Sequence, residues 1–233
     1  MEERVYNFSA GPATLPLPVL KKAQEELLAY PGAGASVMEI SHRSAAFSDI
    51  LARAKASIKE LLGLPENYHV LFLPGGATWQ FSMLAANFLN GATADYVNTG
   101  SWATKAIFEA NKHGTARTAW NGKEEGFVRT PQDAELDIDP NAAYVHFTSN
   151  ETIQGVEFFD EPAVGDTPLF CDASSDFLSR PLGVEKYALL YAGAQKNAGP
   201  AGVAVVIIRD DMLARVPENL PSLMDYKLLA DKD

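Results

Sequence analysis

Tyr191-Ala192-Gly193-Ala194-Gln195-Lys196-Asn197 begins at the last residue of a short apolar run at residues 188–191. A continuously apolar run of this length is typical of a strand covered on both faces, as in a parallel sheet between helices. Lys196 lies among small residues just beyond that strand, a poor place for a solvated surface charge. It can be a strand-end lysine whose stem lies along apolar surface, or an amine tuned by desolvation for covalent chemistry.

The rest of the chain alternates amphipathic helices with short apolar segments. Helices are predicted where apolar residues recur at spacings of three and four, over residues 18–30, 44–62, 78–89 and 101–113. Ser44 can begin the second helix and Gly63 can end it. Strands are predicted over residues 70–73, 94–98, 115–120, 144–148, 169–171, 188–191 and 203–208. The sequence therefore predicts an α/β fold, with a mainly parallel sheet between helix layers.

The apolar residues of three helices are expected to face the core. In the first helix they are Val19, Leu20, Ala23 and Leu27. In the second they are Phe47, Ile50, Leu51, Ala54, Ile58, Leu61 and Leu62, and in the third Phe81, Leu84, Ala85 and Phe88.

Composition excludes several classes of function. The chain has 233 residues, with 30 acidic and 19 basic side chains and a net charge of -11, which argues against a nucleic-acid-binding face. Its apolar runs are too short for a membrane span, and the N-terminus carries no apolar signal core, so a cytoplasmic protein is expected. Cys171 is the single cysteine, so we expect neither an internal disulfide nor a thiolate metal cluster, and we assign no metal-binding residues.

A second candidate functional residue lies at the end of another predicted strand. Asp172 directly follows the apolar segment at residues 169–171. It can be a loop-capping carboxylate, or a ligand-binding group at the carboxyl edge of the sheet. An acid at one such strand end and Lys196 at another form the pattern of pyridoxal phosphate enzymes. There the acid pairs with the pyridinium nitrogen and the lysine forms a Schiff base.

Three weaker signals fall at other strand ends. Gly75-Gly76 lies between a strand and a helix, where backbone N–H groups can hold a phosphate, although a simple turn would look the same. Trp102 can stack on a coenzyme ring or belong to the core. Thr152 can hydrogen-bond the ring substituents or cap a turn. In combination, these residues predict one pocket.

Five stretches of the sequence are specific in combination. They are Asn7-Phe8-Ser9-Ala10-Gly11-Pro12, Glu39-Ile40-Ser41-His42-Arg43-Ser44, Phe147-Thr148-Ser149-Asn150-Glu151-Thr152-Ile153-Gln154-Gly155, Cys171-Asp172-Ala173-Ser174-Ser175 and Ala194-Gln195-Lys196-Asn197-Ala198-Gly199-Pro200. Together they resemble the phosphoserine aminotransferase family of class V aminotransferases, which have the fold type I architecture of PLP-dependent transferases. The resemblance covers essentially the whole chain.

The resemblance implies a role for each site residue. Lys196 would bind pyridoxal 5'-phosphate and shuttle protons, and Asp172 would hold the ring nitrogen. The cofactor-binding residues would be Gly76, Ala77, Trp102, Thr152, Asp172, Gln195 and Lys196, and the substrate-binding residues Ser9, His42 and Arg43. His42 and Arg43 would reach into the neighbouring subunit's site, in a homodimer with shared active sites.

The resemblance also implies the reaction. An amino group would move between glutamate and 3-phosphohydroxypyruvate, giving 2-oxoglutarate and phosphoserine, in the biosynthesis of L-serine. A 4-phosphohydroxy-threonine substrate in pyridoxine biosynthesis is a further implication. The family has an additional C-terminal domain that this sequence lacks, and that part could be a separate chain. Residues 1–15 would form an N-terminal arm and residues 16–233 the large domain that binds the coenzyme.

Three alternatives stand beside this interpretation. The chain could be a catalytically incompetent fragment that binds pyridoxal phosphate. It could be another class V enzyme such as a cysteine desulfurase, which would need Cys171 as a mobile nucleophile rather than a buried apolar residue. An NAD-binding Rossmann enzyme is disfavoured, because no G-x-G-x-x-G follows a first strand.

Overall fold

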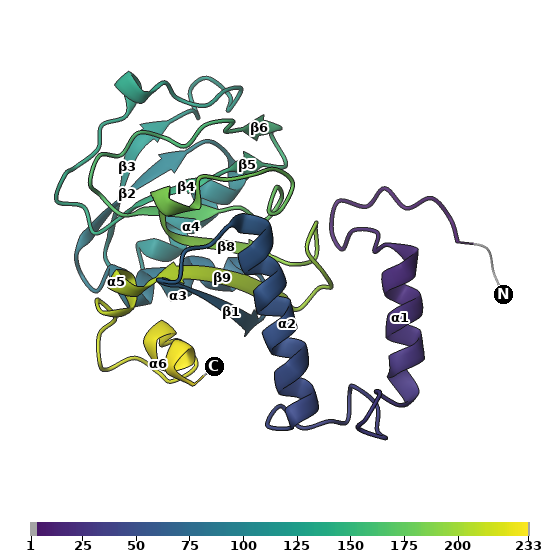
Figure 1. The fold of residues 1–233 in the computed structure, drawn as a ribbon. Helices are drawn as coiled ribbons and strands as arrows, with labels where there is room; N and C mark the ends of the chain where they lie inside the picture. The colour runs from purple at the N-terminus through teal and green to yellow at the C-terminus, as the bar shows by residue number, and fades with distance from the viewer. Residues whose placement is uncertain (1–3, 233) are drawn as a thin grey trace.

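The computed structural model describes residues 4–232, and a twisted sheet runs through its centre (Figure 1). Within these residues the sheet has seven strands in the order β1-β9-β8-β7-β4-β2-β3. Their bounds are β1 Tyr68–Pro74, β2 Thr93–Asn98, β3 Thr115–Asn121, β4 Val145–Thr148, β7 Leu169–Asp172, β8 Tyr187–Gly193 and β9 Val203–Arg209. The pairs from β8 to β3 are parallel, whereas β9 is antiparallel to both β8 and β1. The carboxyl ends of β1, β2, β4, β7 and β8 therefore meet at one edge.

The helices and shorter elements connect these strands. The helices are α1 Leu17–Leu28, α2 Ala45–Leu62, α3 Ala77–Phe88, α4 Ser101–Ala110, α5 Asp210–Leu213 and α6 Tyr226–Asp231, with 3-10 turns at Asp133–Glu135 and Val184–Lys186. A hairpin of β5 Asn150–Glu151 and β6 Val156–Glu157 follows β4. Across residues 4–232, none of the helices combines the length and the apolar character that crossing a bilayer would require.

Both faces of the sheet are covered by apolar side chains. Val206 and Ile208 of β9 belong to a cluster with residues of α3, α4, α5 and α6. Val205 and Ile207 of the same strand belong to a second cluster, which includes Ile58 of α2. Successive strand residues point to opposite faces, so two covered faces require a strand that is apolar throughout. This explains the continuous apolar runs that predicted the fold.

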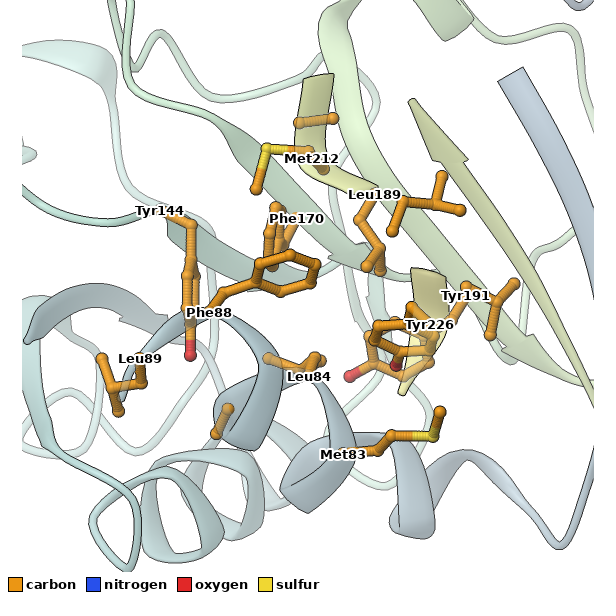
Figure 2. Close-up of a cluster of buried hydrophobic side chains, with 14 of the residues drawn as sticks. Met83, Leu84, Phe88, Leu89, Tyr144, Phe170, Leu189, Tyr191, Met212 and Tyr226 are labelled. Atoms are coloured by element: carbon orange, nitrogen blue, oxygen red, sulfur yellow. The ribbon is translucent and has the colours of Figure 1, made fainter. Parts of the chain in front are cut away.

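An aromatic stack fills the centre of the first cluster (Figure 2). The rings of Tyr144 and Phe170 are parallel, with centroids 4.4 Å apart. Phe88 of α3 meets Phe170 edge-on at 5.2 Å and stacks on Tyr226 of α6 at 5.9 Å. These contacts hold the two helices on the sheet, because aromatic pairs add to the stabilisation from apolar burial.

The predicted boundaries of α2 are confirmed. The Ser44 side chain accepts a hydrogen bond from the N–H of Phe47 over 3.2 Å, which caps the helix start. Gly63, with φ of 61°, occupies the left-handed region that ends the helix. In α3, Phe81, Leu84 and Ala85 are buried as expected, and so is Phe88.

The expected inward face of α1 is not buried. Within the described part of the chain this helix stands apart from the sheet (Figure 1) and contains no buried residue. Val19 and Leu27 are 51% and 45% exposed. In α2 the buried residues are Ile58 and Leu62, whereas Leu61 is 67% exposed. The prediction of a core-facing stripe was therefore wrong for α1, and in α2 it was wrong for Leu61 alone, since the other predicted residues are buried or half-buried. The apolar period identifies a face suited to burial without specifying what covers it.

Candidate functional site

A pocket lies where the parallel strands end. Binding sites of α/β sheets are typically found at this edge. The pocket is lined by Gly76, Ala77, Thr78, Phe81, Trp102, Thr148, Asn150, Thr152, Asp172, Ser174, Ser175, Gln195 and Lys196. The structure therefore brings together all the residues that the sequence assigned to cofactor binding, and their individual roles remain predictions.

Lys196 follows β8 in the loop after Gly193. Its Nζ donates a hydrogen bond to Oγ1 of Thr152 over 2.8 Å and lies 5.6 Å from the centroid of the Trp102 ring. Partial burial lowers the pKa of the Lys196 ammonium, while the carboxylates of Asp172 and Glu151 act in the opposite direction. A lowered pKa leaves more of the amine in its neutral, nucleophilic form.

Asp172 ends β7 and is 4% exposed. Its Oδ1 accepts hydrogen bonds from the N–H and the Oγ of Ser174, over 3.0 and 2.5 Å. Burial raises the pKa of Asp172 to about 6, although the bonds from Ser174 and the charge of Lys196 lower it. The carboxylate is therefore mostly ionised at neutral pH, in a site that would favour a positively charged partner.

The start of α3 can hold an anion. Gly75 has a φ of 94°, a conformation that favours glycine, and it turns the chain from β1 into the helix. Gly76 precedes the first helical residue, Ala77, and no side chain within residues 4–232 caps this end of the helix. The amide groups and the helix dipole therefore favour negative charge at this wall of the pocket.

The other walls fit a flat, polar ring. Trp102 offers an aromatic face, and Thr148 lines the pocket with a buried Oγ1 that has no hydrogen-bond partner within residues 4–232. Each part of pyridoxal phosphate has a matching group in this pocket. The uncapped helix start suits the phosphate, and the indole suits the ring. The buried carboxylate suits the ring nitrogen, and the amine suits the aldehyde. The donor set thus fits the coenzyme expected from the sequence.

Sequence reasoning missed three residues that shape the pocket. Ser174 orients the Asp172 carboxylate, and its Oγ also accepts a hydrogen bond from the N–H of Gly193 over 3.1 Å. Glu151 and Gln154, in the β5–β6 hairpin, bond the start of α4. Ser174 is two residues from Asp172 and could have been found as a turn residue, whereas the hairpin contacts give no local signal.

The expected substrate residues lie outside the pocket lining. Ser9, His42 and Arg43 are exposed. The N-terminal segment nevertheless passes close to the pocket, since the N–H of Ala13 donates to the carbonyl of Gln195 over 2.7 Å. The assignment of Ser9, His42 and Arg43 to substrate binding remains a prediction.

Cys171 is unsuited to nucleophilic catalysis. It lies within β7, is 1% exposed and is not among the pocket-lining residues. Burial raises the pKa of its thiol well above the ordinary value, with a further contribution from the charges of Asp176 and Asp172. A protonated, enclosed thiol behaves as a small apolar residue, which argues against the cysteine desulfurase alternative.

Comparison with known proteins connects this geometry to a family. The family model for aminotransferase class V matches residues 5–223. The phosphoserine aminotransferase of Desulfatibacillum aliphaticivorans is 52% identical over 235 residues, which cover 100% of this chain and 64% of that protein. That of Rhodopirellula baltica is 53% identical over 234 residues, 99% of this chain and 62% of that protein. The chain thus spans less than two thirds of the length of these curated relatives.

Solved structures agree with the sequence comparisons. The phosphoserine aminotransferase from Bacillus circulans subsp. alkalophilus superposes with a TM-score of 0.95 at 47% identity, covering 99% of this chain and 64% of that one. The PLP-bound phosphoserine aminotransferase from Trichomonas vaginalis gives a TM-score of 0.90 at 39% identity, covering 98% and 65%. The expected α/β transferase fold is confirmed.

We expect Asp172→Asn to stabilise the coenzyme-free chain at neutral pH. Because the pKa of Asp172 is raised to about 6, the Asp172 carboxyl binds a proton more tightly in the folded state than in the unfolded state. The contribution of Asp172 to the free energy of unfolding therefore falls as pH rises from about 4 to 6, by at most about 3 kcal/mol. Asn keeps an oxygen for Ser174 and carries no charge.

Denaturant unfolding at pH 4 and pH 7, without coenzyme, measures this difference. The matched control is Asp211→Asn, because that carboxylate has its pKa lowered by hydrogen bonds from Arg209. The control should be less stable than wild type at both pH values, because the stability that a lowered carboxylate pKa contributes is already present above the ordinary pKa of the group. Equal pH dependence of wild type and Asp172→Asn would contradict the expectation.

Proposed function

Because the chain belongs to the class V aminotransferase family, we propose that it forms the coenzyme-binding part of a phosphoserine:2-oxoglutarate aminotransferase. The enzyme would transfer an amino group between glutamate and 3-phosphohydroxypyruvate in L-serine biosynthesis. The observation that carries the proposal is the meeting of Lys196 and the buried Asp172 in one pocket with an uncapped helix start. Relatives of that name, 52% and 53% identical along the chain, support the choice of substrate.

The coenzyme in this proposal is pyridoxal phosphate. When bound, it supplies an aldehyde that combines with amines and a ring that withdraws electrons from the substrate's α-carbon. The amides of Gly76 and Ala77, with the Gln195 side chain, would hold its phosphate. Trp102 would lie against the ring, and Asp172 would keep a proton on the ring nitrogen. The solved Trichomonas vaginalis relative, described as PLP-bound, supports this choice.

Lys196 has two tasks in the proposed reaction. Its Nζ would bind the coenzyme covalently, which its lowered pKa favours. The same Nζ is the basic group of the pocket that can remove and return a proton at the substrate's α-carbon. Thr152 Oγ1 accepts a hydrogen bond from this amine over 2.8 Å and so limits where it can lie.

Substrate recognition is proposed to be shared between subunits of a homodimer. Ser9 would line the substrate side, and His42 and Arg43 would extend into the partner's site, where Arg43 can bind a carboxylate or phosphate with two parallel hydrogen bonds. Their exposure agrees with groups that act outside their own subunit's pocket. We also propose a cytoplasmic location and the division into an arm, residues 1–15, and a large domain, residues 16–233.

A second candidate is a chain that binds pyridoxal phosphate without turning substrate over. It is the outcome expected if Ser9, His42 and Arg43, which lie outside the pocket lining, supply no substrate recognition to any site. Without anionic-group recognition, a bound substrate would be poorly oriented, and misorientation alone can lower a rate by roughly 100-fold. The second experiment below separates the two candidates.

Borohydride reduction of the chain loaded with pyridoxal phosphate should fix the label on Lys196. Peptide mapping by mass spectrometry locates it, and Lys196→Ala should abolish it because Lys196 is the one lysine among the residues that line the pocket. The control is Lys105→Ala, which removes an amine 4.2 Å from the Trp102 ring centroid. It should keep the label. A label that stays in Lys196→Ala would refute the assignment.

Phosphoserine should discharge the visible absorption band of the loaded chain faster than serine does. The phosphate gives the substrate a second anionic group to be recognised, so serine is the matched comparison. Stopped-flow absorption under single-turnover conditions measures both rates. Coenzyme binding with no response to phosphoserine or glutamate would instead favour the binding-only candidate.

Two inactive variants should complement each other if the sites are shared. Dimers mixed from Arg43→Ala and Lys196→Ala subunits contain one intact site in each heterodimer. Random mixing in the assembled enzyme should therefore restore roughly a quarter of wild-type activity. Native mass spectrometry confirms that heterodimers have formed. Heterodimers without activity would show that Arg43 does not act across subunits.

A further inference from the structure

The start of α4 is capped from a distant part of the chain. The residue before the helix is Gly100, which has no side chain to cap it. The N–H of Trp102 donates to Oε2 of Glu151 over 2.9 Å, and the N–H of Ala103 donates to Oε1 over 2.7 Å, across 49 and 48 residues of sequence. One carboxylate thus bonds two successive amides, an arrangement that the helix dipole favours.

Gln154 completes this cap from the same hairpin. Its Oε1 accepts a hydrogen bond from the N–H of Ser101 over 3.2 Å, and its Nε2 donates to the Ser101 Oγ over 2.7 Å. A Cβ at Gly100 would come within 2.6 Å of Cδ of Glu151 and 2.7 Å of Oε1 of Gln154. The glycine is therefore what allows the hairpin to approach the helix. Glu151 is 0% exposed, so this contact is sealed from solvent.

The Trp102 ring packs against the first apolar cluster, but its polar atom is not held by a hydrogen bond to any described residue. Its Nε1 is buried and has no hydrogen-bond partner within residues 4–232. The ring contacts Nζ of Lys105, 4.2 Å from the centroid. Thr152, which accepts the hydrogen bond from Lys196, directly follows Glu151 in the hairpin. The same hairpin therefore contacts the helix start that carries Trp102 and also supplies Thr152, the hydrogen-bond partner of Lys196.

We propose that Glu151, supported by Gln154, is a positioning residue that fixes the Trp102 indole relative to Thr152 and Lys196. It acts on the backbone of α4 and touches neither substrate nor coenzyme. Its importance for coenzyme binding rests on the proposed function. Its hold on the start of α4 is a property of the coenzyme-free chain and can be tested separately.

The first experiment measures hydrogen exchange of the Trp102 and Ala103 amides by NMR in the complete chain without coenzyme. Glu151→Ala removes both acceptors, and Glu151→Gln keeps one. The control is Asp225→Ala, since Asp225 also caps a helix with a carboxylate, accepting from the N–H of Leu228 over 2.9 Å in α6. Glu151→Ala should exchange about tenfold faster, the size of a typical capping loss. Glu151→Gln should be intermediate, and Asp225→Ala unchanged at these amides.

The second experiment titrates the same proteins with pyridoxal phosphate and records circular dichroism in its visible band, which reports the orientation of the ring. The dissociation constant should rise about tenfold in Glu151→Ala, with a weaker dichroic band. Glu151→Gln should lie between, and Asp225→Ala should match wild type. If Glu151→Ala does not fold, Glu151→Gln and Gln154→Ala carry the test.

Folded variants that keep wild-type amide protection and dichroism would overturn the proposal. So would an equal loss of binding in Asp225→Ala, because the effect would then reflect general stability. A wild-type chain that binds no pyridoxal phosphate would refute the proposed function instead. The exchange measurement would then decide alone, with lost protection supporting the role of Glu151 and retained protection overturning it.

Discussion

Burial of a carboxylate at the end of a strand is the constraint on which the pocket depends. A charge removed from water is costly unless other groups compensate for its lost hydration, and Asp172 is 4% exposed. Ser174 gives two hydrogen bonds to one of its oxygens. The parallel pairing of β7 with β8 places Asp172 opposite Tyr191, a few residues before Lys196. The apolar layers on both sides of the sheet keep this register, so the core determines the spacing of the acid and the amine.

The same burial shifts the pKa values of Asp172 and Lys196 in opposite directions. Burial raises the pKa of Asp172 and lowers that of Lys196, while their mutual attraction opposes both shifts. Two titratable groups whose pKa values are both shifted in favour of the uncharged form are typical of sites that move protons. The helix start at Gly76 adds a third polar element without a charged side chain, which would favour an anion even in a chain whose net charge is -11.

Most of the sheet and the pocket could be predicted from the sequence, because the relevant signals are local. Ser44 and Gly63 mark the ends of α2 within one helical turn, and pocket residues follow apolar strands whose ends share an edge. The exposure of the apolar face of α1 could not be predicted, since the period of apolar residues does not specify which neighbours cover them. Glu151 and Gln154 also escaped prediction, because a cap supplied across 48 residues leaves no spacing to recognise.

The glycine before α4 couples the sequence of this helix start to that of the β5–β6 hairpin. With the hairpin closed against it, Gly100 leaves no room for a methyl group beside Glu151, 2.6 Å from where the carbon would lie. A larger residue at this position becomes acceptable only after the carboxylate side chain has shortened or moved, and a shortened side chain would no longer reach the helix. A larger residue at Gly100 and a shorter one at Glu151 would each disturb the same contact, so we expect the effects of the two changes on stability to be non-additive.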